Sequence, residues 1–217
     1  MNFDWGAVAS ALPDLGGGLK LTILIALCGI CGGLVIGAVA GAVLSYSRFL
    51  TPVANAYVGL IRGTPIVVQV MFIYFALPMM ADIKMSGFAA ASLTIAVNSG
   101  AFFAEIFRGA LQSVPRGMYE AALAMGLPFW RILTYVLAPL ALRRAIPPLG
   151  NQVIASVKDT SIFLVIGVAE LTREGQAIMA SNFKAIEIWS TVAVIYLLLI
   201  TCIAAMLRLV ERGIATP

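Results

Sequence analysis

Two adjacent charged residues, Lys158 and Asp159, lie inside a long apolar stretch, residues 145–169. A charge near the centre of a membrane-spanning helix costs about 2.5–3.5 kcal/mol, so such residues usually face a cavity or a partner. Neighbouring residues on a helix point about 100° apart, so we do not expect these two to pair with each other. A zwitterionic amino acid could satisfy both of them. The alternative is a structural or gating ion pair with another residue, such as Glu105 or Glu170.

Two further polar residues, Asn98 and Glu105, lie in the apolar stretch 87–111. They are seven residues apart and therefore share one helical face. An amide facing lipid would be left without hydrogen-bond partners, so we expect this face to look into a helix bundle. Asn98 is then a candidate for a substrate path or for an interhelical hydrogen bond. Glu105 could instead pair with Arg108, three residues later.

Thr64 and Pro65 interrupt another apolar stretch, residues 53–80. Thr followed by Pro is typical of a helix N-cap and the first helical position. A half-helix beginning there would direct its positive end into the protein, as transporters do toward anionic groups. The alternative is a bend where an interfacial helix enters the membrane, with Arg62 reaching the cytoplasmic surface.

The residues that most catalytic centres need are missing. The sequence contains no histidine, which excludes every His-dependent triad. Cys28 and Cys31 form a C-x-x-C pair, but no second pair or histidine completes a zinc site. The sequence has no G-x-x-x-x-G-K-[ST] phosphate loop, so this chain cannot hydrolyse ATP. We predict a protein that is not an enzyme, with no catalytic or metal-binding residues and no cofactor of its own.

The composition is that of a membrane protein. Hydrophobic residues make up 61% of the chain and charged residues only 11%, against about 45–50% and about 25% in soluble domains. Backbone hydrogen bonding in lipid requires helical spans. We therefore predict an all-α integral membrane protein with about five spans and no separate soluble domain. The expected spans are residues 19–47, 53–80, 87–111, 145–169 and 188–207.

The basic residues indicate the orientation, because cytoplasmic loops are enriched in Lys and Arg. An outside N-terminus makes residues 1–18 a periplasmic segment and residues 212–217 a cytoplasmic tail. The cytoplasmic side then holds Arg48, Arg108, Arg116, Arg131, Arg143, Arg144, Arg208 and Arg212, and the outer side holds Lys20, Lys84, Arg173 and Lys184. The net charge of +4 is dispersed between apolar stretches and does not indicate nucleic-acid binding.

Glycines recur every four residues in the first span, at Gly29, Gly33, Gly37 and Gly41. On a helix they stack on one face, where small residues let a neighbouring helix approach closely. We predict a tightly packed helix pair along this face.

The connection between the third and fourth spans, about residues 113–130, contains an apolar stripe at helical spacing: Met118, Ala121, Ala122 and Met125. Gly126 and Pro128 supply a helix stop. The pattern predicts a short amphipathic helix on the cytoplasmic face. Such a helix could dock a partner or lie on the lipid surface.

The spacing of this loop is more specific than its amphipathicity. Glu120-Ala121-Ala122, then Gly126, then Val136-Leu137-Ala138-Pro139 nine residues later resembles the E-A-A-x3-G-x9-I-x-L-P signature of permease subunits of binding-protein-dependent ABC importers. Val136 and Ala138 replace the usual Ile and Leu. Other segments resemble the polar amino-acid branch of that family, and its glutamine permeases most closely: residues 61–70, 105–109, 147–152, 158–161 and 167–172.

The resemblance implies a type I ABC importer transmembrane domain over residues 19–211, with five core helices and a cytoplasmic coupling helix. It implies a second permease subunit, expected to be identical, and a cytoplasmic ABC ATPase dimer that binds ATP and Mg. It also implies a periplasmic amino-acid-binding protein and an inner-membrane location. The function expected is glutamine import by alternating access; another polar amino acid, such as glutamate, arginine or histidine, is the alternative.

The residue types, their positions and the loop motif together assign residues to two roles. The expected ATPase-coupling residues are Glu120, Ala121, Ala122, Gly126 and Pro139. The expected substrate path or gate consists of Thr64, Gln69, Asn98, Glu105, Lys158, Asp159, Thr160 and Ser161. Two other functions would fit a multi-span protein. A membrane enzyme would need a nucleophile with a base, which is not evident, and a self-sufficient channel would leave the loop helix without a task.

Overall fold

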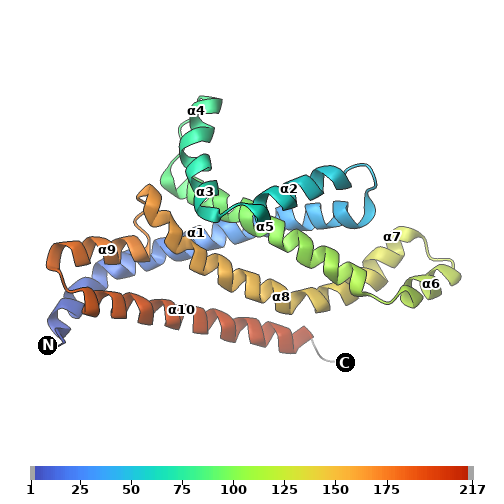
Figure 1. Cartoon of the computed structure of the whole chain (residues 1–217). Coiled ribbons are helices and arrows are strands. Elements are labelled where there is room, and N and C mark those ends of the chain that lie inside the picture. The colour runs from blue at the N-terminus through green and yellow to red at the C-terminus, as the bar shows by residue number, and fades with distance from the viewer. Residues whose placement is uncertain (1–2, 215–217) are drawn as a thin grey trace.

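Figure 1 shows the chain as an elongated helical molecule. The structure, a computed structural model, describes residues 3–214, and within that range every regular element is helical. The first half contains α1 (Trp5–Tyr46), α2 (Thr51–Gly63), α3 (Ile66–Met71), the π-helical η1 (Phe72–Ala76), α4 (Leu77–Ala81) and α5 (Gly87–Ser113). The second half contains α6 (Arg116–Ala124), α7 (Phe129–Arg131), the π-helical η2 (Ile132–Leu137), α8 (Ala138–Asp159), the 3-10 helix η3 (Thr160–Ile166), α9 (Leu171–Asn182) and α10 (Ala185–Ile214).

Four helical stretches are long and apolar enough to cross a membrane: Trp5–Tyr46, Gly87–Ser113, Phe129–Ile166 and Ala185–Gly213. A fifth candidate is the pair Thr51–Gly63 and Ile66–Ala81, whose helices are bent by 105° at the break between them. This agrees with the predicted all-α fold of about five spans. The break falls at Thr64 and Pro65, as expected from the sequence.

The first helix begins earlier than the expected span of residues 19–47. α1 starts at Trp5 because Asp4 acts as its N-cap, with Oδ1 accepting a hydrogen bond from the Ala7 amide at 3.1 Å. Most of the expected periplasmic segment 1–18 is therefore helical. Residues 1–2 of that segment and residues 215–217 of the expected tail lie outside the described range.

The helix that contains the expected fourth span is also longer than that span. The helical stretch runs from Phe129 to Ile166, whereas the expected span began at residue 145. Lys158 and Asp159 are the last two residues of α8 and lie in the C-terminal part of this stretch. The helix starts earlier because the arginines before residue 145 continue the helix instead of ending it.

The predicted glycine-mediated packing is confirmed, and the partner is α5. A Cβ atom added to Gly29 would lie 2.5 Å from the Cβ of Ile95, and one added to Gly41 would lie 2.9 Å from the carbonyl oxygen of Ala104. No real side chain tolerates such distances, so glycine is required for this approach of α1 to α5. α8 also packs against α5, which makes α5 the central helix of the chain.

The two ends of the molecule are built from different parts of the chain. The N-terminus and α9 lie at one end, and α6, α7 and the C-terminal part of α10 lie toward the other (Figure 1). At the first end, the Asp4 amide donates to Glu187 at 3.2 Å, and Lys184 lies 3.4 Å from the Asp4 carboxylate. These contacts join the start of α1 to the start of α10.

Candidate functional site

One buried amide holds the broken span against the central helix. Gln69, on α3, is 8% exposed. Its Nε2 atom donates to the carbonyl oxygens of Ile61 at 2.8 Å and Thr64 at 3.0 Å, which belong to the last turn of α2 and its C-cap. Asn98 on α5, 6% exposed, donates to Gln69 Oε1 at 3.0 Å. The amide of Gln69 therefore connects α2, α3 and α5 at the break.

Two sequence expectations can be compared with this geometry. Asn98 forms the interhelical hydrogen bond that was one of its two expected roles. Thr64 is not the N-cap of the following helix. Pro65 occupies that position without a side-chain cap, and the Thr64 hydroxyl donates backward to the Leu60 carbonyl at 2.9 Å. The N-cap expectation failed because the hydroxyl satisfies the end of α2 instead.

Ionic and aromatic contacts strengthen the same junction. The Glu105 carboxylate accepts from Arg108 at 2.6 Å, the expected pairing three residues apart, and lies 3.8 Å from Arg62 on α2. The Arg62 guanidinium also lies 5.3 Å from the centre of the Phe102 ring. The Tyr57 hydroxyl donates to the Val97 carbonyl at 2.7 Å. We call the contacts that Tyr57 and Arg62 on α2 and Gln69 on α3 make with α5 the junction.

A second polar contact, which the sequence analysis missed, joins α5 to α8. The hydroxyls of Ser99 and Ser156 lie 2.7 Å apart, and both residues are buried. Ser99 follows Asn98 directly, so neighbouring positions on α5 contact the broken span and α8. A serine in an apolar stretch was the only available sign, and serine is common in membrane helices.

The segment Lys158–Ser161 lies at the end of α8 and the start of η3, and η3 packs against α3 and α5. Lys158 is exposed and Asp159 is partly exposed. No ion pair is formed by either residue within residues 3–214, so the alternative of an ion pair with Glu105 or Glu170 is not formed. Thr160 is buried and donates to the Val157 carbonyl at 2.7 Å, and Ser161 donates to the Lys158 carbonyl at 2.8 Å. These hydroxyls end α8, while the two charges remain available.

Glu170 is a buried carboxylate with a structural role. It is 0% exposed and caps α9 by accepting from the amides of Thr172 at 2.9 Å and Arg173 at 2.8 Å. The Tyr196 hydroxyl on α10 donates to it at 3.0 Å. Burial raises the pKa of Glu170, and these hydrogen bonds act in the opposite direction. An acidic residue directly before a helical pattern was the sign of this cap in the sequence.

The expected coupling helix exists as α6, and its residues face different surroundings. Glu120 and Ala121 are exposed, and Met125 just beyond the helix is 72% exposed. Ala122 is only 2% exposed, so its side chain packs within this chain, and its expected part in coupling stays a prediction. It packs inside the chain because α6 folds back onto η2. Gly126 has φ +74°, the left-handed conformation expected of a helix stop. Pro139 lies outside α6, in the first turn of α8.

The described residues contain no group of three or more His, Cys, Asp or Glu side chains that could hold a metal. Most of the predicted site residues lie at the junction, at the end of α8 or in α6 and the turn after it, and Pro139 lies at the start of α8. Hydrogen bonds join Thr64, Gln69 and Asn98, and another joins Ser161 to Lys158. Polar contacts thus connect α3 to α5 and α5 to α8.

Comparisons with known proteins identify the class. Residues 33–216 match the family model described as the binding-protein-dependent transport system inner membrane component. The chain is 55% identical over 214 residues to the glutamine transport system permease protein GlnP of Escherichia coli (strain K12), covering 98% of both chains. It is 30% identical to the arginine transport system permease protein ArtQ of Bacillus subtilis (strain 168), covering 98% and 97%.

Solved structures agree with this. A crystal structure of an amino acid ABC transporter with histidines matches with a TM-score of 0.90 and 31% identity, covering 98% of this chain and 100% of that one. These findings define a membrane-spanning permease subunit with the type I ABC importer fold. The chain belongs to the family of inner-membrane components of binding-protein-dependent transport systems. The resemblance found in the loop motif is thereby confirmed.

Proposed function

We propose that this chain is the permease through which an ATP-driven importer moves glutamine across the inner membrane. The observation that carries the proposal is the 55% identity to a glutamine permease over 98% of both chains. Permeases named for arginine and for L-cystine are 30% and 34% identical to this chain. This difference in identity favours glutamine over the other polar amino acids.

The assembly that fits this function has two copies of the chain, a cytoplasmic ATPase dimer and a periplasmic glutamine-binding protein. ATP and Mg bind to the ATPase, since this sequence has no phosphate loop. The N-terminus faces the periplasm and the C-terminus faces the cytoplasm. This orientation is supported by the positions of four arginines. Arg116 begins α6 and Arg131 ends α7, while Arg208 and Arg212 lie near the end of α10.

Lys158 and Asp159 receive the substrate or control its passage in this proposal. Each is charged, and within residues 3–214 neither forms an ion pair. A glutamine zwitterion offers a carboxylate to the lysine and an ammonium group to the aspartate. The junction would transmit movement of the broken span to α5, and Ser99 with Ser156 would pass it to α8.

α6 is the contact for the ATPase. Its exposed residues Glu120 and Ala121, with Met125 just beyond its end, form the surface that a cytoplasmic partner can reach. Ala122 anchors the helix from beneath, because it is buried against this chain.

The function is tested with purified permease, its ATPase and its binding protein reconstituted in proteoliposomes. We expect ATP-dependent uptake of labelled glutamine, with little competition from excess glutamate, arginine or histidine. Liposomes without the permease are the control. Equal or faster uptake of one of the other amino acids would assign the chain to that substrate instead. Uptake without ATPase would indicate a channel.

A further inference from the structure

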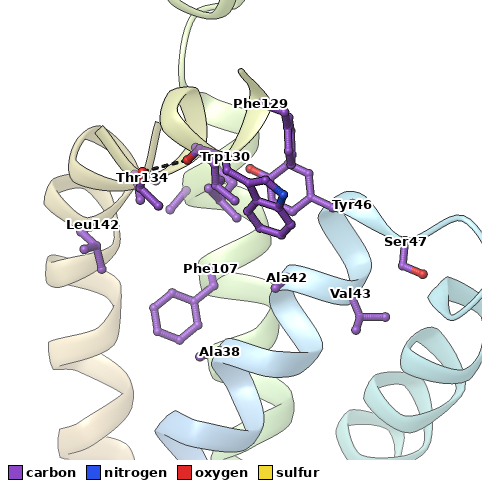
Figure 2. Close-up of a pocket in the computed structure, with 15 residues that line it drawn as sticks. Ala38, Ala42, Val43, Tyr46, Ser47, Phe107, Phe129, Trp130, Thr134 and Leu142 are labelled. Carbon is purple, nitrogen blue, oxygen red and sulfur yellow. Dashed lines mark hydrogen bonds between the residues drawn. The ribbon is translucent and has the colours of Figure 1, made fainter. Parts of the chain in front are cut away.

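A cavity of about 620 Å³ lies beside the end of α1, between that helix, α5 and the segment that leads into α8. Its size falls within the range of about 300–1,000 Å³ typical of small-molecule sites. None of its lining residues is charged, and most are apolar. In Figure 2, Ala38, Ala42 and Phe107 lie along one part of the cavity.

The opposite part of the cavity is formed by aromatic side chains. Tyr46 and Phe129 have ring centroids 5.6 Å apart, and Phe129 and Trp130 have the same separation. Figure 2 shows these three rings gathered at the end of α1, away from Ala38. Trp and Tyr concentrate where a membrane meets water. The cavity therefore has an apolar interior and an end suited to the interface.

Two arginines directly follow lining residues of this aromatic end in the sequence. Arg48 follows the lining residue Ser47, and Arg131 follows the lining residue Trp130. Both arginines are exposed, and neither forms an ion pair within residues 3–214. Basic pockets between membrane helices bind the head groups of anionic lipids. The charge therefore selects an anionic amphiphile over a neutral one.

We propose that this cavity binds one anionic phospholipid, with an acyl chain between α1, α5 and α8 and its phosphate near Arg48 and Arg131. The occupied site would join the end of α1 to α7 and η2, the segment that follows α6. The bound lipid would thus hold in place α7 and η2, the segment that follows the proposed ATPase-contacting helix α6. This site goes beyond the transport function and does not depend on which amino acid is carried.

The site is tested on the purified assembled transporter by native mass spectrometry and by photo-crosslinking. The probe is phosphatidylglycerol carrying a diazirine in its acyl chain, with phosphatidylcholine carrying the same group as the comparison. We expect retained phosphatidylglycerol adducts, and crosslinks in peptides that contain Tyr46, Phe107 or Trp130. Replacing Arg48 and Arg131 together by Gln should weaken phosphatidylglycerol binding roughly 30-fold. Each basic residue near an anionic lipid surface contributes about 1 kcal/mol of binding free energy, and two such losses correspond to this change in affinity.

A variant that fills the cavity distinguishes lipid bound in the pocket from lipid in general contact with the protein surface. Ala42→Phe should abolish the crosslinks, because Ala42 lines the cavity and a ring there occupies the acyl-chain space. Ala205→Phe, at an exposed position on α10, and Arg212→Gln are the matched controls and should retain them. Equal retention of phosphatidylcholine would overturn the choice of an anionic lipid. Crosslinks unchanged by Ala42→Phe, or crosslinks to a second copy of the chain at these peptides, would overturn the site.

Discussion

The Gln69 side chain makes contacts that no other residue type would reproduce. Its amide donates to two carbonyls at the end of α2 and accepts from Asn98 on α5. Replacing it with leucine leaves these buried groups without partners, which costs about 1–3 kcal/mol. We expect Gln69→Leu to lower the thermal unfolding midpoint in detergent. The exposed Gln112 provides a control, and equal midpoints for Gln69→Leu and Gln112→Leu would show that the junction does not stabilise the fold.

Asp159 tests the proposed substrate contact with a minimal change. Asp159→Asn preserves the shape but removes the charge that would meet an ammonium group. We expect glutamine uptake to fall while binding of the ATPase to the permease stays unchanged, as measured by transport and co-purification. Asp14→Asn, at an exposed position on α1, should transport normally. Wild-type uptake by Asp159→Asn would remove both the contact and the gate from this residue.

The buried carboxylate of Glu170 predicts a pH dependence of stability. Burial raises its pKa in the folded protein above the ordinary value of 4.5. The folded state then binds the proton more tightly than the unfolded chain. This contribution is fully present below the unfolded pKa and is lost as pH rises through the folded pKa. Glu170→Gln lacks this titration, so the midpoint of the wild type minus that of the variant should decrease from pH 4 toward neutral pH. An increasing difference would mean that the hydrogen bonds to the carboxylate lower its pKa by more than burial raises it.

The sequence identified many of the residues that matter and could not show how they meet. Asn98 and Gln69 are 29 positions apart, and only the bend at Thr64 brings them together. Ser99 and Ser156 carried no sign that they would touch. The pairing of Glu105 with Arg108 was predictable because helix geometry alone sets it. The spacing of residues in the sequence predicts contacts within one helix. Contacts between helices depend on how the helices pack, which spacing alone does not show.

At the scale of elements, the glycine face of α1 makes the sharpest prediction. A Cβ atom at Gly37 would lie 3.0 Å from the Gly100 carbonyl oxygen and would also clash with Phe103. We expect Gly37→Ala to destabilise the protein by about 1–3 kcal/mol, because α1 must move away from α5.

The same substitution at Gly17 is a matched control on the same helix, where nothing lies within 4 Å of an added Cβ. Alanine should be neutral there or stabilise by about 0.5–1 kcal/mol, because glycine costs a helix that much. Gly37→Ala should thus lower the unfolding midpoint, and Gly17→Ala should leave it unchanged or raise it. Equal shifts would mean that backbone propensity, and not packing, decides the effect at Gly37.

Helix existence was easier to predict than helix ends. Each apolar stretch in the sequence corresponds to a helix or a broken pair in the structure. The start of α1 was missed because the N-terminal residues before 19 looked too polar for a span, although Asp4 caps a helix there. The start of the α7–α8 stretch was missed because arginines were taken as loop residues. Charged residues mark the edge of the bilayer, and helices extend past that edge.

In the proposed assembly, the whole molecule receives the free energy of ATP hydrolysis from a partner chain. The proposed coupling therefore depends on a contact that differs in energy between inward and outward states. The helix proposed for this contact, α6, and the turn after it lie toward the end of the molecule opposite the N-terminus (Figure 1). Gly126 forms the turn with φ +74° and no atom within 4 Å of an added Cβ. The position therefore needs glycine for its backbone conformation and not for space.

Gly126→Val should break this coupling without preventing insertion into the membrane. A β-branched residue disfavours the left-handed conformation by roughly 1–2 kcal/mol, so the turn after α6 would change its path. We expect transport and substrate-stimulated ATPase activity to be lost together in reconstituted transporter, while the amount of permease in the membrane stays the same. Gly59→Val, at a helical glycine with open space, is the matched control and should retain both activities. If Gly126→Val transports glutamine as well as Gly59→Val does, the turn has no part in coupling, and α6 is a surface helix only.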